Sequence, residues 1–153
     1  MHSDEFYLQR AVVLAASNVA GGGRPFAALL VKNGQVIVEA VNTIHISQDP
    51  TAHAELLAIR AASQQLGPRL EGCVIYASGQ PCPMCLSAMH LCGVTRVVYA
   101  ASNQQGEPFG LSTAAIYQQL ALPLSEQKLT IQHLPQPAMD KIYSDWKACH
   151  EPG

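Results

Sequence analysis

The chain has 153 residues, of which 48% are hydrophobic and 13% are charged, and its net charge is −2 at pH 7. This composition excludes a disordered or fibrous protein and fits a single domain over residues 1–153 with a sizeable core. Only nine lysines and arginines are present, which leaves little basic surface for phosphate groups. We therefore expect a small molecule, and not a nucleic acid, as the binding partner.

The N-terminal segment is unlike a signal peptide, because MHSDEFYLQR carries acidic residues where a signal peptide needs basic ones. No apolar run reaches the length that spans a membrane, so we expect a cytoplasmic protein with no membrane partner. Disulfides are rare in that compartment. Of the five cysteines, we expect the three that lie outside a Cys-x-x-Cys motif to be reduced, namely Cys73, Cys92 and Cys149.

The first predicted element is a helix. Ser3 and Asp4 are typical N-cap residues, and they predict a helix that continues to about Ala20. Its predicted apolar side consists of Phe6, Leu8, Val12, Val13 and Ala16. The glycines 21–23 then end the helix. We do not interpret them as a phosphate-binding loop, because no G-x-G-x-x-G or P-loop pattern follows.

A β-hairpin is predicted after this helix. The runs Phe26 to Val31 and Gln35 to Val41 are rich in residues that favour strands, and they flank Asn33-Gly34. Asn-Gly between two such runs is a strong signal for a tight hairpin turn. These runs are therefore the first two predicted strands.

The segment His53-Ala54-Glu55 is the first half of a predicted metal site. Residues two apart on a regular helix do not share a face. His53 and Glu55 can therefore approach one metal ion only if they lie in the first turn, with the ion beyond the end of the helix. The preceding Asp49-Pro50-Thr51 is a helix start signal that supports this placement.

The segment Pro81-Cys82-Pro83-Met84-Cys85 is the second half. Pro83 suits the first position of a helix, so both thiols lie where the helix dipole favours thiolates. One imidazole and two thiolates supply three ligands of a tetrahedral zinc ion and leave the fourth position for water, as in catalytic zinc sites. The carboxylate of Glu55 could then carry protons between water, the substrate nitrogen and departing ammonia.

Neither half is specific by itself, and two alternatives from other classes of protein stay open. One is a redox protein that uses Cys82 and Cys85 as a dithiol. The other is a structural zinc module for protein interactions, which needs a fourth protein ligand. The possible fourth ligands are Cys73, His45 and His90. The two halves in this order, each at a strand-to-helix junction, match the H-x-E and P-C-x-x-C signature of zinc deaminases.

Further elements are predicted in the rest of the chain. They are strands at Cys73 to Ala77, Arg96 to Ala101 and Lys128 to Leu134, helices at Cys82 to Cys92, Ser112 to Leu120 and Ala138 to His150, and a loop at Asn103 to Pro108. The alternation of short apolar strands with helices predicts an α/β fold, in which ligands bind at the carboxyl ends of strands. Residues 137–153 are predicted to form a helical tail.

Through the segments DPTAHAELLAIR and QPCPMCLSAM, the chain resembles the cytidine deaminase-like superfamily, in the branch of guanine deaminases and tRNA adenosine deaminases. The resemblance extends from about Pro25 to Leu122. It implies a three-layer α-β-α fold with a central mixed five-stranded sheet. It also implies a Zn²⁺ ion bound by the histidine and two cysteines above, Glu55 as the catalytic acid and base, and a homodimer. Within the cysteine helix, we interpret Met89 and His90 as core or dimer-interface residues.

The resemblance also implies substrate contacts. In these families an aromatic residue before the first strand stacks on the heterocycle, and an asparagine after the second strand donates to its carbonyl. Phe26 and Asn42 match these positions, and Ala54 and Pro81 are expected to contact the substrate as well. Two simpler interpretations stay open, in which Phe26 belongs to the core and Asn42 caps a turn.

The substrate is harder to predict, because the chain departs from the family pattern. Gln80 replaces a glutamate of many relatives, and Ser112 and Thr113 replace acidic residues of guanine deaminases ahead of Ile116-Tyr117. A hydroxyl accepts hydrogen bonds from guanine more weakly than a carboxylate does. We predict deamination of a free nucleobase, first of guanine to xanthine and ammonia. The alternatives are cytosine, a pterin, a triazine or tRNA adenosine.

Overall fold

The computed structural model describes residues 2–150, and the chain divides into two compact units, 1–118 and 119–153. In chain order the elements are α1 (Asp4–Ala20), β1 (Ala27–Lys32), β2 (Gln35–Val41), α2 (Ile44–Ser47), α3 (Ala54–Leu66), β3 (Cys73–Gly79), α4 (Pro83–Cys92), β4 (Arg96–Ala101), α5 (Asn103–Gly106), α6 (Ala114–Leu120) and α7 (Ala138–His150). Short 3-10 helices lie at Glu107–Phe109 and Leu124–Glu126. None of the described helices is long and apolar enough to cross a membrane.

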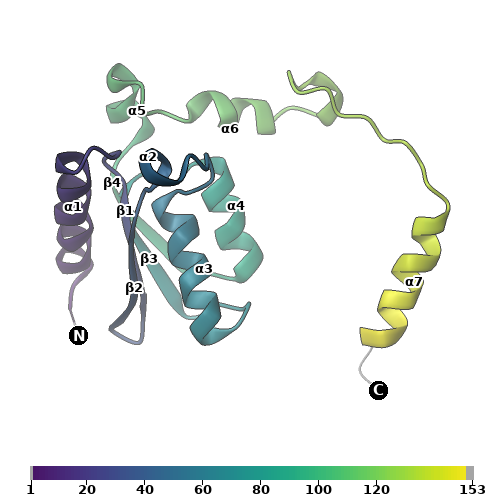
Figure 1. Cartoon of the computed structure of the whole chain (residues 1–153), viewed down its shortest axis with the longest axis horizontal. Helices are drawn as coiled ribbons and strands as arrows, with labels where there is room; N and C mark the ends of the chain where they lie inside the picture. The colour runs from purple at the N-terminus through teal and green to yellow at the C-terminus, as the bar shows by residue number, and fades with distance from the viewer. Residues whose placement is uncertain (1, 151–153) are drawn as a thin grey trace. The chain divides into compact units, whose positions relative to one another are not determined.

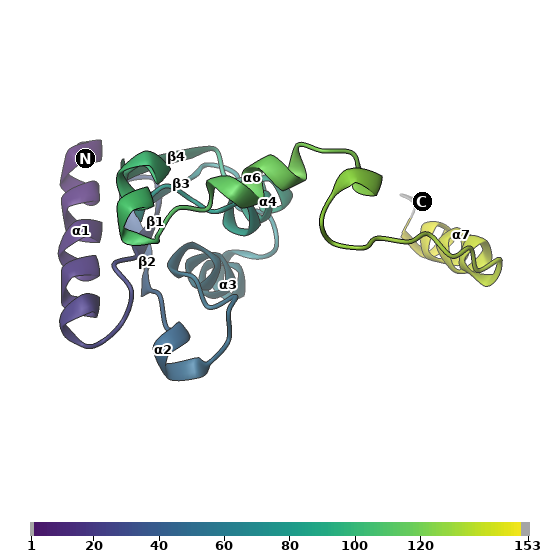
Figure 2. The same ribbon diagram turned by 90° about the horizontal axis from the view of Figure 1, so that it is seen from above.

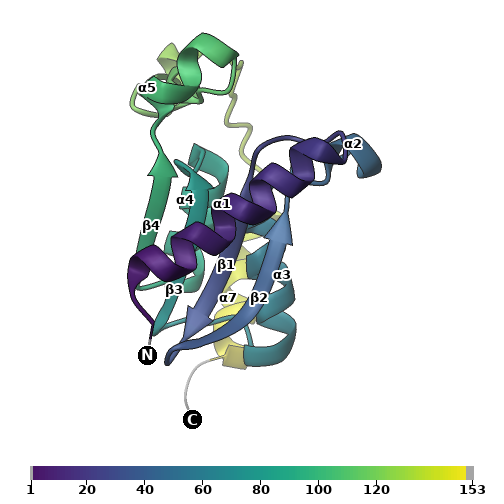
Figure 3. The same cartoon turned by 90° about the vertical axis from the view of Figure 1, so that its left-hand side faces the viewer.

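The first unit contains one mixed sheet between two layers of helices (Figure 1). Its strand order is β2-β1-β3-β4, in which β1 is antiparallel to both neighbours and β3 is parallel to β4. Helix α1 covers one face, and α3 and α4 cover the other; Figure 3 shows α1 lying across the strands. The predicted three-layer α-β-α fold is thus confirmed.

The number of strands differs from the prediction. The sheet has four strands within residues 2–150, because the run Lys128 to Leu134, predicted as an edge strand, forms no strand. This run alternates apolar and polar residues, but Leu129 and Leu134 are exposed. A strand needs a neighbouring strand to pair its backbone groups, and alternation alone supplies none.

The central strand β1 is buried on both faces. Ala28 and Leu30 pack into the cluster beneath α3 and α4, whereas Leu29 and Val31 pack with Tyr7 and other residues beneath α1. Successive side chains of a strand point to opposite faces, so β1 contributes to both halves of the core. Because both of its faces are buried, β1 is the central strand of the core.

Helix α1 begins at Asp4 with Ser3 as its N-cap, as predicted, but it buries a different side. Tyr7, Ala11 and Ala15 are buried, while Val12 and Val13 of the predicted apolar side are 46% and 58% exposed. Apolar residues occur on most sides of this helix, so their spacing in the sequence does not identify the side that is buried. The small alanine side chains let α1 approach the sheet closely.

Residues 103–108, predicted as a loop, form α5 and the start of a 3-10 helix instead. The side chain of Ser102 accepts a hydrogen bond from the backbone of Gln105, and the Gln105 side chain accepts one from the backbone of Ser102. This capping box satisfies amide donors that a helix start leaves unpaired. The Ser-x-x-Gln spacing in the sequence is the signal for it.

The second unit has its own ordered helix. Helix α7 has the predicted bounds, Ala138–His150, and Lys141 forms an ion pair with Asp145 one turn further on. The rings of Trp146 and His150 stack with their centroids 4.4 Å apart. The last three residues of the predicted tail, 151–153, lie outside the described residues.

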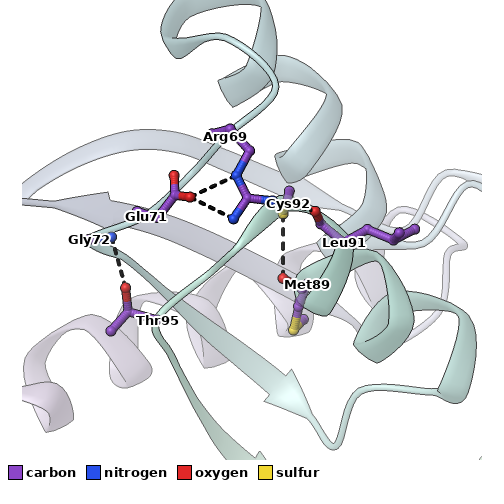
Figure 4. Close-up of polar contacts among 7 residues, drawn as sticks. All are labelled: Arg69, Glu71, Gly72, Met89, Leu91, Cys92 and Thr95. Carbon is purple, nitrogen blue, oxygen red and sulfur yellow. Dashed lines mark hydrogen bonds and ion pairs between the residues drawn. The ribbon is translucent and has the colours of Figure 1, made fainter. Parts of the chain in front are cut away.

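The C-terminal end of α4 is anchored by the loop that precedes β3 (Figure 4). Arg69 Nη1 donates to the carbonyl oxygen of Leu91 over 2.9 Å, and Arg69 Nε donates to Glu71 Oε1 over 2.7 Å. The helix ends at Gly93, whose φ of 81° lies in the left-handed region. Arg69 therefore satisfies a carbonyl group that the end of a helix leaves unpaired.

We predict that Gly93→Ala destabilises the protein more than Gly110→Ala. Both glycines are left-handed, with φ of 81° and 73°. A Cβ at Gly93 would lie 2.6 Å from Arg69 Nη2, whereas a Cβ at Gly110 meets nothing within 4 Å. We expect a loss of about 1 kcal/mol for Gly110→Ala from backbone strain, and of about 2 kcal/mol for Gly93→Ala, which also displaces the Arg69 guanidinium.

Urea unfolding of the two variants measures these losses. In an Arg69→Ala background the difference between the two substitutions should shrink, because the closest contact is gone and only Glu71 Oε1, 3.2 Å from a Cβ at Gly93, remains. Equal losses in the presence of Arg69 would show that the guanidinium does not restrict Gly93.

Candidate active site

One edge of the sheet collects the segments that carry the predicted site. Ala27 at the start of β1 pairs with Val41 at the end of β2, and Ala28 pairs with Ala77 near the end of β3. The residues that precede β1 and follow β2 and β3 therefore meet at this edge. Helices α3 and α4 both begin here, on the face opposite α1 (Figure 2).

The structure brings His53, Cys82 and Cys85 together at these helix starts. His53 is the N-cap residue of α3, and Cys82 is the N-cap residue of α4. His53 Nδ1 lies 3.4 Å from Cys82 Sγ and 3.6 Å from Cys85 Sγ. The donor atoms of the three residues all lie within 4.8 Å of one another.

This donor set fits a zinc ion. Tetrahedral zinc with the usual bond lengths to sulfur and nitrogen separates those two ligand atoms by about 3.5 Å, close to both distances found here. None of the candidate fourth ligands, Cys73, His45 and His90, belongs to the cluster. Cys73 is buried in the core, and the ring of His45 lies against Gly23. A closed structural site with four protein ligands is therefore disfavoured.

The environment of the two thiols differs. The hydrogen bond from the Cys85 thiol and the contact with His53 lower the pKa of Cys82, and the backbone N–H of Cys85 also donates to Cys82 Sγ. The adjacent Cys82 sulfur, together with burial, raises the pKa of Cys85. The hydrogen bond with Cys82 raises the pKa of His53. A coordinating cation favours the deprotonated form of a thiol, so a metal ion offsets the cost of ionising Cys85.

Glu55 lies in the first turn of α3, two residues after His53, and its residue is only 6% exposed. Burial raises the pKa of its carboxyl group to about 7. Such a group can both accept and release a proton near neutral pH, as a general acid and base must. Glu55 lines the same cavity as His53 and Cys82.

The cavity contains about 570 Å³ of empty space, part of it open to solvent. Its wall is made of Arg24, Phe26, Asn42, His53, Glu55, Gln80, Cys82, Gly110, Leu111, Ser112 and Thr113. Of the predicted substrate contacts, Phe26 and Asn42 line the cavity. Ala54 and Pro81 are buried residues next to the cluster and are not part of its wall.

Asn42 has a structural role that also fixes the direction of its amide. Its Oδ1 accepts a hydrogen bond from the backbone N–H of Ile44 over 3.0 Å, as the turn-capping interpretation proposed. Because a backbone N–H requires an acceptor, the oxygen is assigned, and the Nδ2 group is left as the donor for a ligand. The two interpretations of Asn42 are therefore compatible.

Phe26 forms a side wall because Gly79 lets its ring approach the end of β3. A Cβ at Gly79 would lie 2.8 Å from Phe26 Cε1, closer than side-chain carbons normally come. The ring is partly buried and lines the cavity. An aromatic ring held in this way offers a flat surface for stacking.

The sequence did not point to several residues that shape the cavity. Arg24 lines it, and Tyr117 donates a hydrogen bond from its hydroxyl to the carbonyl oxygen of Pro81. Asn18 Nδ2 donates to the carbonyl oxygens of Arg24 and Asn42 over 2.8 and 3.0 Å. These contacts join residues from separate segments, and no local motif marks them.

Residues 1–101 match the family described as the cytidine and deoxycytidylate deaminase zinc-binding region. The chain belongs to this family of zinc-binding deaminases, which confirms the superfamily inferred from the two motifs. It is 42% identical to a guanine deaminase of Bacillus subtilis over 127 residues, which cover 82% of this chain and 81% of that protein. A crystal structure of guanine deaminase from the same organism superposes with a TM-score of 0.91 at 35% identity, covering 99% of this chain and 98% of that one.

Two further relatives broaden the comparison. A tRNA-specific adenosine deaminase of Bacillus subtilis is 40% identical over 107 residues, which cover 69% of this chain and 66% of that protein. A crystal structure of a protein in complex with 2,6-diaminopurine has a TM-score of 0.69 at 28% identity and covers 74% of this chain and 64% of that one. The fold is thus shared by relatives named for different substrates.

We predict that the purified protein binds zinc stoichiometrically and that Cys82→Ala loses most of it, because two ligands hold zinc less tightly than three. Metal analysis after dialysis measures the content. Cys73→Ala is the matched control, since Cys73 is equally a buried cysteine but lies outside the cluster. Full zinc content in Cys82→Ala would remove Cys82 from the ligand set.

Proposed function

We propose that this chain hydrolyses the exocyclic C–N bond of a free amino-heterocycle, with conversion of guanine to xanthine and ammonia as the leading reaction. The observation that carries this proposal is the buried carboxyl group of Glu55 beside a histidine and two cysteines in one small cavity. The likeness to guanine deaminase over nearly the whole chain supports guanine. The region matched to guanine deaminase covers 82% of this chain, whereas the region matched to the tRNA-specific adenosine deaminase covers 69%.

His53, Cys82 and Cys85 are proposed to hold Zn²⁺, and a zinc ion supplies Lewis-acid activation of water in such sites. Glu55 accepts a proton from the attacking water and delivers it to the ring nitrogen beside the reacting carbon. It then takes the remaining proton from the hydroxyl group added to the ring and passes it to the amino group, which leaves as ammonia. The carboxyl group ends in its starting state, and the ring gains a carbonyl oxygen from water.

The substrate is proposed to lie against Phe26, with its carbonyl oxygen accepting from Asn42 Nδ2. The buried residues Ala54 and Pro81 are proposed to contact the reacting part of the ring. The small basic content of the chain supports a free base over a folded tRNA.

Two accompanying properties are also proposed. A cytoplasmic location is supported by the five cysteines, all of which are free. A homodimer rests on relatives of this branch and on Leu91 of α4, which is 80% exposed. Met89 is buried in the core, so it supports the core interpretation and adds nothing to an interface, whereas His90 is exposed.

We predict that Glu55→Gln keeps its zinc and its fold but loses about 10²- to 10⁴-fold in turnover, the usual contribution of general acid-base catalysis. Ammonia release from guanine, cytosine, pterin and triazine substrates measures turnover. Glu107→Gln, which changes a glutamate outside the cavity wall, is the control and should retain activity. Near-normal turnover in Glu55→Gln would mean that protons travel by another route.

Sedimentation velocity tests the proposed dimer. We expect a dimer at micromolar concentration and a shift toward monomer in Leu91→Asp, because a buried charge without a partner opposes association. Arg60→Asp, which places the same carboxylate at an exposed position of α3, should leave the dimer intact. A monomeric wild-type protein at that concentration contradicts the dimer and leaves the proposed chemistry untouched.

A further inference from the structure

The wall of the cavity beyond the metal cluster contains a cation that the proposed mechanism does not use. Arg24 lines the cavity two residues before Phe26. Its carbonyl oxygen accepts hydrogen bonds from the backbone N–H of Phe26 and from Asn18 Nδ2, both over 2.8 Å. The backbone of Arg24 is thereby held in place, while the residue is exposed to solvent and its charge opposes the rise in the pKa of His53 that the Cys82 hydrogen bond causes in the same cavity.

Arg24, like Arg60, differs from the other three arginines in having no ion-pair partner among the described residues. Arg10, Arg69 and Arg96 form ion pairs with Glu39, Glu71 and Asp4. Within residues 2–150, Arg24 forms no ion pair. A guanidinium group carries five N–H donors in a planar fork and remains charged. The cavity mouth therefore presents a positive group able to donate two parallel hydrogen bonds.

Three of the other polar side chains of the wall have an oxygen that accepts from the protein. Gln80 Oε1 accepts from the backbone N–H of Asn103 over 2.9 Å, as Asn42 Oδ1 does from Ile44. Ser112 Oγ accepts from the backbone N–H of Ala114 over 3.1 Å, whereas the Thr113 hydroxyl donates to Asn103 Oδ1 over 3.5 Å. The N–H donors left to face a ligand are therefore the amide nitrogens of Asn42 and Gln80 and the guanidinium of Arg24. Among the residues of the wall, Glu55 is the sole carboxylate.

A wall of donors selects a ring edge that carries acceptors. In guanine the reacting amino group is on C2, and the edge that carries O6 and N7 lies on the opposite side of the ring system. With C2 placed beside Glu55, that edge faces away from the metal cluster. An arginine fork matches O6 and N7 of guanine with two hydrogen bonds, a pairing that is common in guanine recognition.

We propose that Arg24 is a specificity-determining residue whose guanidinium donates to O6 and N7 of a 6-oxopurine. This inference rests on the proposed function. It explains how guanine could be selected although Ser112 and Thr113 supply no carboxylate for its N–H groups. A purine with an amino group at C6 would place donors against donors, and the cavity would reject it.

The test compares guanine with 2,6-diaminopurine, which keeps the 2-amino group and replaces O6 with a second amino group. Chromatography of the products follows loss of the 2-amino group. We expect the zinc-loaded wild type to prefer guanine, and Arg24→Ala to lower kcat/KM for guanine by roughly 10- to 100-fold. Most of that loss should appear in KM. The value for 2,6-diaminopurine should change by no more than about threefold, because the hydrogen bond that the fork gives to N7 of this ring is offset by the contact between the fork and its 6-amino group.

Two variants distinguish the two-hydrogen-bond geometry of the Arg24 guanidinium from its charge and from the general effect of removing an arginine. Arg24→Lys keeps the charge without the fork and should recover only part of the guanine preference. Arg60→Ala removes an exposed arginine outside the cavity and should change neither substrate. Equal losses for both purines in Arg24→Ala, or none for either, would overturn the proposal.

Hypoxanthine binding tests the role of Arg24 independently of the proposed reaction. Hypoxanthine carries O6 and N7 but has no amino group to lose, so its affinity, measured by calorimetry, is independent of catalysis. If the wild type releases no ammonia from guanine, the proposed reaction fails. At least tenfold weaker hypoxanthine binding in Arg24→Ala would still support the role of Arg24, and unchanged binding would overturn it.

Discussion

The antiparallel pairing of β1 with both β2 and β3 is the constraint on which the site depends. It brings the segment that enters β1 to the same edge as the segments that leave β2 and β3. Phe26, Asn42 and the cysteine turn come from these three places. A shift of the register by one residue would exchange the two faces of β1. The core and the cavity are therefore specified by the same set of backbone hydrogen bonds.

The reactive side chains at this edge come from the starts of α3 and α4. His53 and Cys82 occupy N-cap positions, where the chain is extended and the side chain can point past the end of the helix. Glu55 lies within the first turn and is buried. Because α4 is anchored by Arg69 at its other end, the cysteines sit on a helix fixed at both ends. The proposed zinc ligands are thus positioned by the starts of two helices.

Local signals predicted much of this arrangement. The N-cap and proline signals located the starts of α1 and α4, and Asn33-Gly34 located the β1–β2 hairpin. The buried side of α1 could not be predicted, since apolar residues surround most of that helix. The run Lys128 to Leu134 has the alternation of a strand but lacks a partner. In both cases the outcome depends on a distant segment, about which a local pattern carries no information.

The site residues that were predicted belong to local motifs, whereas those that were missed make contacts between distant segments. His53 and Cys82 belong to short motifs, and the structure brings their side chains together. Arg24, Asn18 and Tyr117 act across segments far apart in the sequence, through contacts that only the folded chain creates. The substrate contacts proposed for Phe26 and Asn42 followed from family resemblance, because neither residue type alone indicates such a role.

Asn18 connects α1 to two segments of the cavity wall. Its amide nitrogen donates to the carbonyl oxygens of Arg24 and Asn42, so one side chain of α1 joins the segment that precedes β1 to the segment that follows β2. The last turn of α1 therefore restrains both segments. A displacement of this end of the helix would be passed to both of them through a single side chain.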